Sequence, residues 1–301
     1  MFDTVRLKAE SIIIESIVLE SLEAKVTTYL DKNTGVFTDV YTFAFNNIPF
    51  VKYNSSTLVL EIELSIPKFL FDENITLLTM KDIDAFFTLL SHQLRNVLRV
   101  DIDRSEWKAK RIDVCWNFNV GNKVTDYLFQ LSLMKYPRRD TVTYNQTETV
   151  VWQNNSGRIM FYDKEKERRR KNAHSNFIER AKGILRMEVS PSDHEIREYS
   201  VDKRANRLLT KEFFVFVTRK ISPYLVFKGT HELSIEWLQS LKSVQVAETI
   251  IGFTSLSKAF GDATLKQIYS QGTFNNRLKL LEQSPQTTAL NPLEISYSAI
   301  N

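Results

Sequence analysis

The chain has 301 residues, of which 43% are apolar and 25% are charged, a composition typical of folded globular proteins. Its 40 Lys and Arg residues exceed its 36 Asp and Glu residues by only 4, which argues against a polybasic coat protein. Gly is rare, at 8 residues, and no GxGxxG or GxxxxGKS/T motif occurs. Neither a dinucleotide-binding fold nor a P-loop NTPase is therefore supported.

The single cysteine, the positions of the histidines and the length of the apolar runs exclude further classes of protein. The single cysteine, Cys115, rules out an internal disulfide and a structural zinc site built from cysteines. The four histidines are scattered and form no HExxH motif. No run of about 20 apolar residues and no cleavable signal peptide is present, so we expect a soluble, intracellular protein with no membrane partner.

The first 210 residues show strand patterns interrupted by two helical ones. Residues 2–68 are strand-like; within them Leu58–Leu64 alternates between apolar residues and the acids Glu61 and Glu63. Apolar residues recur at helical spacing from Ile83 to Leu98 and again within Asn122–Lys135. Later strands are predicted at Lys108–Asn119, Thr141–Gln153 (a hairpin), Arg158–Glu165 and Ile184–Ser190, with a charged segment at Lys166–Lys182.

From about Lys211 the pattern becomes helical. Ser234–Leu241 and Leu265–Leu281 have helical spacing, and the tail Gln283–Asn301, which contains Pro285 and Pro292, is expected to be irregular. The sequence therefore predicts an α+β fold whose largely antiparallel sheet is covered by helices on one face. We expect residues 1–210 to form the sheet domain and residues 211–301 a C-terminal helical region.

The predicted strands share a chemically useful polar face. Besides Glu61 and Glu63, this face carries Asp113 with Asn117, Tyr162 with Lys164, and Arg186 with Glu188. Gathered in one sheet, such carboxylates suit Mg²⁺ or Mn²⁺, and a tyrosine beside them can attack a phosphodiester. A neighbouring lysine can lower the tyrosine pKa or neutralise phosphate charge. The alternative is that this face is polar only because it meets water.

Basic residues concentrate between Arg158 and Arg186. Ten basic residues stand there against four acidic ones, a net charge of +6, which leaves −2 for the rest of the chain. Such a cluster is a candidate phosphate-binding surface, although i,i+4 ion pairs on a solvated helix are an equally good alternative. The candidate DNA-binding residues are Arg158, Lys166, Arg168, Arg169, Arg170, Lys171 and Arg186.

Four motifs occur in order along the sheet domain: RID at 111–113, TVTYNQTET at 141–149, RIMFYDK at 158–164 and LRMEV at 185–189. With them the chain resembles the phage and plasmid replication proteins of the gene II/X type, which are filamentous-phage rolling-circle initiators, and more distantly the Rep trans plasmid initiators. LEIELSIPK at 60–68 resembles an earlier strand of that family, and GTFNNRLKLL at 272–281 is similar to a helix near the end of the gene II type.

This resemblance implies a relaxase-like nicking enzyme in the cytoplasm of a bacterial host. Tyr162, assisted by Lys164, would take the 5′ phosphate of one strand of origin DNA and leave a 3′-OH primer. Asp113, Glu188 and either Glu61 or Glu63 would hold Mg²⁺ or Mn²⁺. The partners implied are origin DNA, first double-stranded and then single-stranded, and a host helicase and DNA polymerase. The His-hydrophobic-His pair of the wider relaxase-like superfamily is missing.

Other interpretations stay open at this point. A conjugative relaxase or a transposase would use the same chemistry, and a DNA-binding regulator would need only the basic surface. Tyr199, in a polar stretch beyond Glu188, and Tyr144, on the neighbouring hairpin, compete with Tyr162 as nucleophile.

Overall fold

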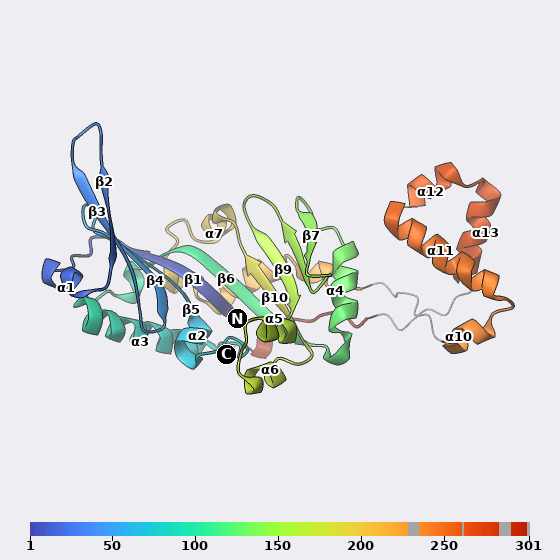
Figure 1. Cartoon of the computed structure of the whole chain (residues 1–301), viewed down its shortest axis with the longest axis horizontal. Coiled ribbons are helices and arrows are strands. Elements are labelled where there is room, and N and C mark those ends of the chain that lie inside the picture. The colour runs from blue at the N-terminus through green and yellow to red at the C-terminus, as the bar shows by residue number, and fades with distance from the viewer. Residues whose placement is uncertain (228–234, 261, 283–289, 300–301) are drawn as a thin grey trace. The chain divides into compact units, whose positions relative to one another are not determined.

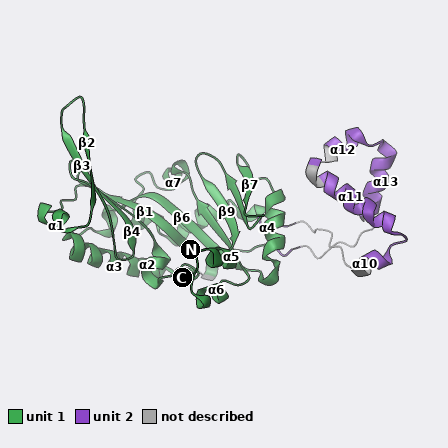
Figure 2. Ribbon diagram, in the orientation of Figure 1, with its two compact units in different colours: residues 1–224, 293–301 green, residues 225–292 purple. Residues whose placement is uncertain are grey.

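The computed structural model describes residues 1–227, 235–260, 262–282 and 290–299. The chain divides into two compact units (Figure 2). Unit 1 comprises Met1–Tyr224 and Leu293–Asn301, and unit 2 comprises Leu225–Pro292. In the described residues, no helix combines the length and the apolar character that crossing a membrane requires.

Unit 1 is built on a ten-stranded sheet in which each neighbouring pair is antiparallel (Figure 1). The strand order is β2-β3-β4-β5-β1-β6-β10-β9-β8-β7. This confirms the predicted α+β class with a large antiparallel sheet. The strands are β1 (Phe2–Ala9), β2 (Lys25–Leu30), β3 (Phe37–Phe45), β4 (Ile48–Asn54), β5 (Val59–Ser65), β6 (Lys108–Asn119), β7 (Asp140–Tyr144), β8 (Thr149–Gln153), β9 (Arg158–Asp163) and β10 (Ile184–Ser190).

The helices of unit 1 lie in the connections between strands and in the segment after β10. The α-helices are α1 (Ser16–Ser21), α2 (Ile66–Phe71), α3 (Met80–Leu98), α4 (Val124–Leu133), α5 (Lys164–Arg170), α6 (Ser175–Arg180), α7 (Asp193–Tyr199), α8 (Ala205–Leu208) and α9 (Lys211–Arg219). Short 3-10 turns are η1 (Arg104–Glu106), η2 (Gly121–Lys123), η3 (Ser222–Tyr224) and η4 (Tyr297–Ala299).

The long helix α3 follows directly from its sequence. Thr79 and Asp82 form a capping box, in which each side chain satisfies a backbone N–H of the first turn. The predicted apolar stripe from Ile83 to Leu98 is buried, and Phe86 packs edge-on against Phe69 of α2 at 5.6 Å between ring centroids. The stripe therefore fixes which face of α3 points inward.

Helices cover the apolar face of the sheet. On the central strands this face carries Phe2 and Trp116, which contact the ring of Phe214 in α9 at centroid distances of 6.5 and 5.9 Å. Farther along, the Trp152 indole donates a hydrogen bond to the Leu131 carbonyl of α4 at 3.3 Å. The prediction of helices on one face is incomplete, however, because α5 also packs against β9 and β10 and its Lys164 contacts Tyr162 on the polar face.

The predicted strand at 158–165 ends earlier than expected. β9 stops at Asp163, whose carboxylate accepts a hydrogen bond from the Lys166 backbone N–H at 3.1 Å and so caps α5. Lys164 is consequently the first residue of a helix rather than a strand residue. It still lies beside Tyr162, as the alternation predicted.

The predicted boundary at 211 differs from the observed division after Tyr224. The physical reason is the aromatic packing of α9, since Phe213 and Phe214 are both buried and belong to unit 1. The described part of the predicted irregular tail, 290–299, contains only the turn η4, and Tyr297 returns to α9, where its hydroxyl lies 3.1 Å from that of Thr218. The rest of that tail, 283–289 and 300–301, lies outside the described residues.

Unit 2 contains α10 (Ile235–Ser240), α11 (Val244–Phe260), α12 (Asp262–Ile268) and α13 (Gln271–Glu282). Phe253, Leu265 and Phe274 form its main buried cluster. The single helix predicted over 265–281 is two helices, because the Ser270 hydroxyl accepts a hydrogen bond from the Thr273 backbone N–H at 3.3 Å. That contact is an N-cap, and it starts α13 as a separate helix.

Candidate functional site

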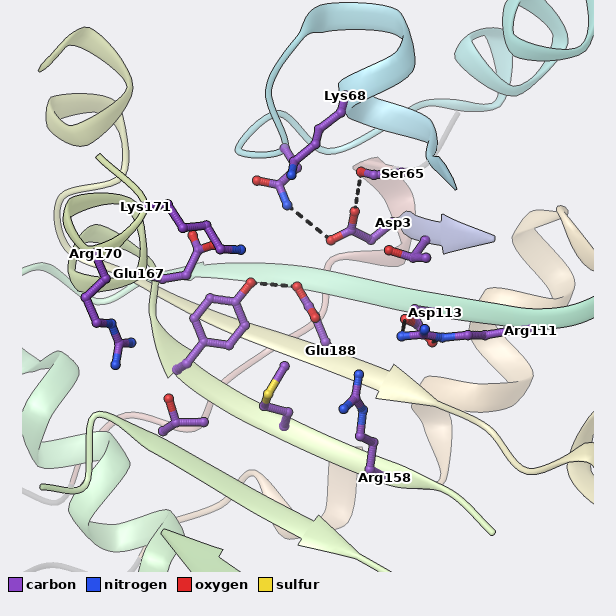
Figure 3. Close-up of a pocket in the computed structure, with 15 residues that line it drawn as sticks. Asp3, Ser65, Lys68, Arg111, Asp113, Arg158, Glu167, Arg170, Lys171 and Glu188 are labelled. Carbon is purple, nitrogen blue, oxygen red and sulfur yellow. Dashed lines mark hydrogen bonds and ion pairs between the residues drawn. The ribbon is translucent and has the colours of Figure 1, made fainter. Parts of the chain in front are cut away.

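A pocket of about 310 Å³ opens on the polar face of the central strands (Figure 3). We call it the central pocket. Its walls come from β1, β5, α2, β6, β8, β9, α5 and β10, so segments far apart in the sequence meet there. Beside Tyr162 it is lined by the acids Asp3, Asp113, Glu167 and Glu188 and by the bases Lys68, Arg111, Arg158, Arg170 and Lys171.

Strand register explains why the predicted residues gather there. Arg186 of β10 is directly opposite Tyr162 of β9 on one side and Asn117 of β6 on the other. Directly opposed residues of antiparallel strands share a face, and so do residues two apart on one strand. Tyr162, Arg186 and Glu188 therefore lie on one face, as the sequence pattern predicted.

Tyr162 is buried, with 5% of its surface exposed. Its hydroxyl donates a hydrogen bond to Glu188 Oε1 at 2.6 Å and accepts one from Lys164 Nζ at 3.4 Å. Burial, and then the negative charge of Glu188, raise the pKa of Tyr162 well above its ordinary value. The expectation that Lys164 lowers this pKa is not met, and the Glu188 carboxylate is the group placed to accept the Tyr162 proton.

Lys164 is fully buried at the first turn of α5. Its Nζ donates to Asn74 Oδ1 at 2.9 Å and pairs with Glu167 at 3.2 Å. Burial, and then the positive charge of Arg186, lower the pKa of Lys164 from 10.5 to about 8. The ammonium therefore loses its proton more easily than an exposed lysine does.

A pH experiment tests this lowered pKa. Between pH 8 and 9.5 the unfolded chain binds more protons at Lys164 than the folded one, so folding stability should rise with pH, by up to about 1.4 kcal/mol per pH unit. Lys164→Met should remove this rise. Urea unfolding of both proteins across that range measures it, and because both retain Tyr162 and Cys115, their difference isolates Lys164. Parallel pH profiles would show that Lys164 has an ordinary pKa.

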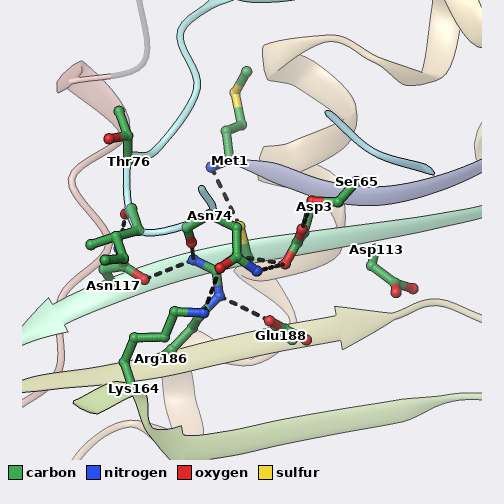
Figure 4. A network of polar contacts seen from close by, with 12 residues as sticks. Met1, Asp3, Ser65, Asn74, Thr76, Asp113, Asn117, Lys164, Arg186 and Glu188 are labelled. Atoms are coloured by element: carbon green, nitrogen blue, oxygen red, sulfur yellow. Dashed lines mark hydrogen bonds and ion pairs between the residues drawn. The ribbon is translucent and has the colours of Figure 1, made fainter. Parts of the chain in front are cut away.

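Arg186 is the centre of a buried polar network (Figure 4). It donates to Asp3 Oδ2 at 2.7 Å, to Glu188 Oε1 at 2.9 Å and to the Asn74 carbonyl at 2.9 Å. Burial is the largest single influence on the pKa of Asp3 and would raise it, but the charges of Arg186 and Lys164 and the hydrogen bonds from Ser65 and Arg186 together bring the net pKa below its usual value. Arg186 was predicted to bind DNA; its complete burial corrects that assignment, and the residue instead positions Glu188.

Asp3 is a site residue that the sequence analysis missed. The register of β1 against β6 shifts between Phe2 and Val5, which is a β-bulge, and both Asp3 and Thr4 line the central pocket. A bulge directs two successive side chains to one face and so breaks the two-residue period. No pattern in the sequence could have revealed this, because the bulge depends on pairing with a strand about 110 residues away.

The predicted acids do not form one cluster. Asp113 lines the central pocket, where both its oxygens accept hydrogen bonds from Arg111, at 3.0 and 2.5 Å. Arg111 also donates to Glu63 at 3.2 Å. Glu61 lines a different pocket and pairs with Arg6 and Lys110. Within the described residues, no three His, Cys, Asp or Glu side chains are arranged to hold a metal ion.

Members of the predicted basic cluster line the central pocket, form ion pairs within the protein, or do both. Arg158, Arg170 and Lys171 line the central pocket. Arg168 is buried beside Glu167, so it is poorly placed to contact DNA. The remaining members are engaged on the protein surface: Lys166 pairs with Glu148 at 3.1 Å, and Arg169 pairs with Glu165 at 2.7 Å. Two of the residues that line the pocket are also paired, Arg170 with Glu148 at 3.5 Å and Lys171 with Glu167. The helical i,i+4 alternative therefore describes both Arg169 and Lys171 correctly.

The competing tyrosines lie in different surroundings. Tyr199 packs against the rings of Phe213 and Phe216 at about 5 Å between centroids. Tyr144 is exposed at the end of β7, opposite Thr149, which is itself opposite Tyr162. Of the two, only Tyr144 shares the face of the sheet on which Tyr162 lies.

No protein-family model matches the chain, and no curated protein matches it.

Proposed function

We propose that this protein nicks and rejoins one strand of DNA through Tyr162, acting as a rolling-circle replication initiator with a relaxase-like core. The observation that carries the proposal is the 2.6 Å hydrogen bond from the Tyr162 hydroxyl to Glu188 at the wall of a pocket lined by bases. A tyrosine, a proton acceptor and phosphate-binding cations are the groups that such a transfer needs.

The chemistry would proceed by direct displacement at phosphorus. Glu188 accepts the Tyr162 proton as the phenolic oxygen bonds to the phosphorus, and the bond from phosphorus to the 3′ oxygen breaks. The 3′ oxygen takes a proton from water as it leaves and becomes the 3′-OH, and the 5′ phosphate stays on Tyr162. Attack of a 3′-OH on the phosphotyrosine reverses the step and rejoins the strand, because the phosphodiester energy is conserved.

The charged lining suits a phosphate group. Arg158, Arg170 and Lys171 come from β9 and the end of α5 and would neutralise the scissile phosphate and its neighbours. Mg²⁺ is often bound by one or two carboxylates together with substrate phosphates. Asp113 and Glu188 are the residues that would hold Mg²⁺ or Mn²⁺, in competition with Arg111, and the ion would polarise the phosphoryl oxygens.

Asp113→Asn tests the metal assignment. We expect the variant to fold, since the change is nearly isosteric, and to lose about a hundredfold or more in cleavage, as when one electrostatic stabiliser is removed. Titration calorimetry with Mn²⁺ should show weaker binding, a readout that does not depend on cleavage. Asp126→Asn, on the exposed side of α4, is the matched control. Unchanged Mn²⁺ affinity and activity in Asp113→Asn would remove this carboxylate from the metal site.

The overall proposal can be tested without knowing the origin sequence. A random-sequence, single-stranded oligonucleotide pool is incubated with the protein and Mn²⁺, and adducts that survive detergent are recovered and sequenced. We expect a covalent adduct enriched in one sequence. Binding without an adduct would favour a non-catalytic regulator, whereas products in which two different oligonucleotides of the pool are joined would favour a relaxase or transposase. Recruitment of a host helicase and polymerase to the 3′-OH belongs to the replication proposal alone.

A further inference from the structure

A row of lysines crosses the polar face of the sheet away from the central pocket. We call it the lysine row. It is defined by strand register, because each residue is directly opposite the next across an antiparallel pair and therefore shares its face. From β2 to β6 the members are Lys25, Thr42, Lys52, Glu61, Lys8 and Lys108. At about 4.8 Å between strands, the row is roughly 24 Å long.

A second row runs beside it and reaches the central pocket. Its members, from β4 to β6, are Phe50, Glu63, Arg6 and Arg111. Arg111 lines the central pocket, where it binds Asp113. A second register shift, between Arg6 and Leu7 in the pairing of β1 with β6, lets Lys110 reach Glu61 on the same face as Arg111. The polar face is thus continuous from the lysine row to Tyr162.

The two rows carry an excess of positive charge. The two carboxylates of the rows are each shared between two cations, Glu61 between Arg6 and Lys110 and Glu63 between Arg6 and Arg111. Glu10, which follows β1, is likewise shared between Lys8 and Lys108. The carboxylates therefore hold the basic side chains in place without neutralising them all. These side chains remain open to solvent, from 27% exposed at Lys8 to 44% at Lys110.

We propose that this surface binds the single strand of DNA that leads to the central pocket. The charge excess suits a phosphate backbone, and the partly exposed Phe50 with the Arg6 guanidinium over its ring, 5.1 Å from the centroid, adds an aromatic and cationic contact for a base. An open sheet face can accommodate a single strand of DNA, whereas proteins that read the sequence of duplex DNA insert a helix or a β-ribbon into one of its grooves. Only the destination of the strand rests on the proposed nicking function.

The test is fluorescence anisotropy of the full-length protein with labelled oligo(dT) over a range of salt concentrations. The variant combines Lys8→Gln, Lys52→Gln and Lys108→Gln. Each phosphate contact on a single strand contributes about 0.7 to the slope of log K against log salt, so the variant's slope should fall by about 2 and its affinity by about tenfold or more. The control combines Lys123→Gln, Lys135→Gln and Lys220→Gln, which are exposed lysines next to α4 and α9, and should bind like the wild type.

Each outcome decides the inference. Wild-type affinity and slope in the lysine-row variant would overturn it, as would equal competition by polyglutamate for the oligo(dT) site of the wild type. Lys→Arg at the same three positions should restore binding, which separates lost charge from altered folding. If the wild type forms no adduct but the lysine-row variant still loses oligo(dT) binding, nicking fails and this inference stands. Adduct formation by the wild type, with unchanged oligo(dT) binding in the variant, would overturn this inference and leave nicking standing.

Discussion

Replacing Tyr162 by Phe is expected to abolish covalent capture of DNA, with a loss on the order of 10³-fold or more, while DNA affinity stays close to that of the wild type. The ring keeps its packing, and Glu188 keeps its contact with Arg186, so only the attacking oxygen is lost. Detergent-resistant adducts and anisotropy with the same oligonucleotide measure the two effects. Tyr144→Phe, on the same face of the sheet, is the matched control and should retain full capture.

Two results would contradict this expectation. Capture by Tyr162→Phe at the wild-type rate would mean that another group attacks the phosphate. Loss of capture in Tyr144→Phe alone would transfer the role to the exposed Tyr144.

Arg186→Met is expected to cost about 3–5 kcal/mol of folding stability, the largest effect on stability that we predict. The substitution leaves the Asp3 carboxylate buried without its cation, and Glu188 and the Asn74 carbonyl lose a hydrogen-bond donor. Arg197→Met removes an exposed arginine paired with Asp193 and should cost less than about 1 kcal/mol. Urea unfolding compares the two variants directly.

The double variant Arg186→Met with Asp3→Asn sharpens this test. Neutralising Asp3 removes the uncompensated buried charge, so the double variant should be more stable than Arg186→Met alone. Equal stabilities of the single and double variants would mean that the stability lost in Arg186→Met does not come from breaking the Arg186–Asp3 ion pair.

Part of the sheet could be predicted because several of its strands alternate between apolar and polar residues. The patterns at 58–64 and 184–190 correspond to β5 and β10, and the stripe from Ile83 to Leu98 corresponds to α3. The order of the strands could not be predicted, since β1 lies between β5 and β6 through contacts between residues 50 to 110 positions apart. The end of the sheet domain was placed too early because the burial of Phe213 and Phe214 depends on partners such as Phe2.

Residues of the candidate site could be predicted from the sequence where the face of the sheet on which a side chain lies is enough to bring it to the pocket. Tyr162, Glu188 and Asp113 line one pocket because alternation placed each of them on the polar face. Charge counting failed for Arg186, because net charge does not show which arginine is buried among acids. Charge counting also could not distinguish Glu61, which lies in the lysine row, from Asp3, which a bulge turns into the central pocket.

The most direct test of the central claim is peptide mapping of the covalent adduct. Wild-type protein is captured on the selected oligonucleotide, digested with nuclease and trypsin, and sequenced by mass spectrometry. Trypsin separates the three candidates, because Tyr162 lies in the peptide 159–164, Tyr144 in 140–158 and Tyr199 in 198–203. We predict a nucleotide on Tyr162 within 159–164; a nucleotide on either of the other peptides, or on none, would contradict the assignment of Tyr162 as the nucleophile.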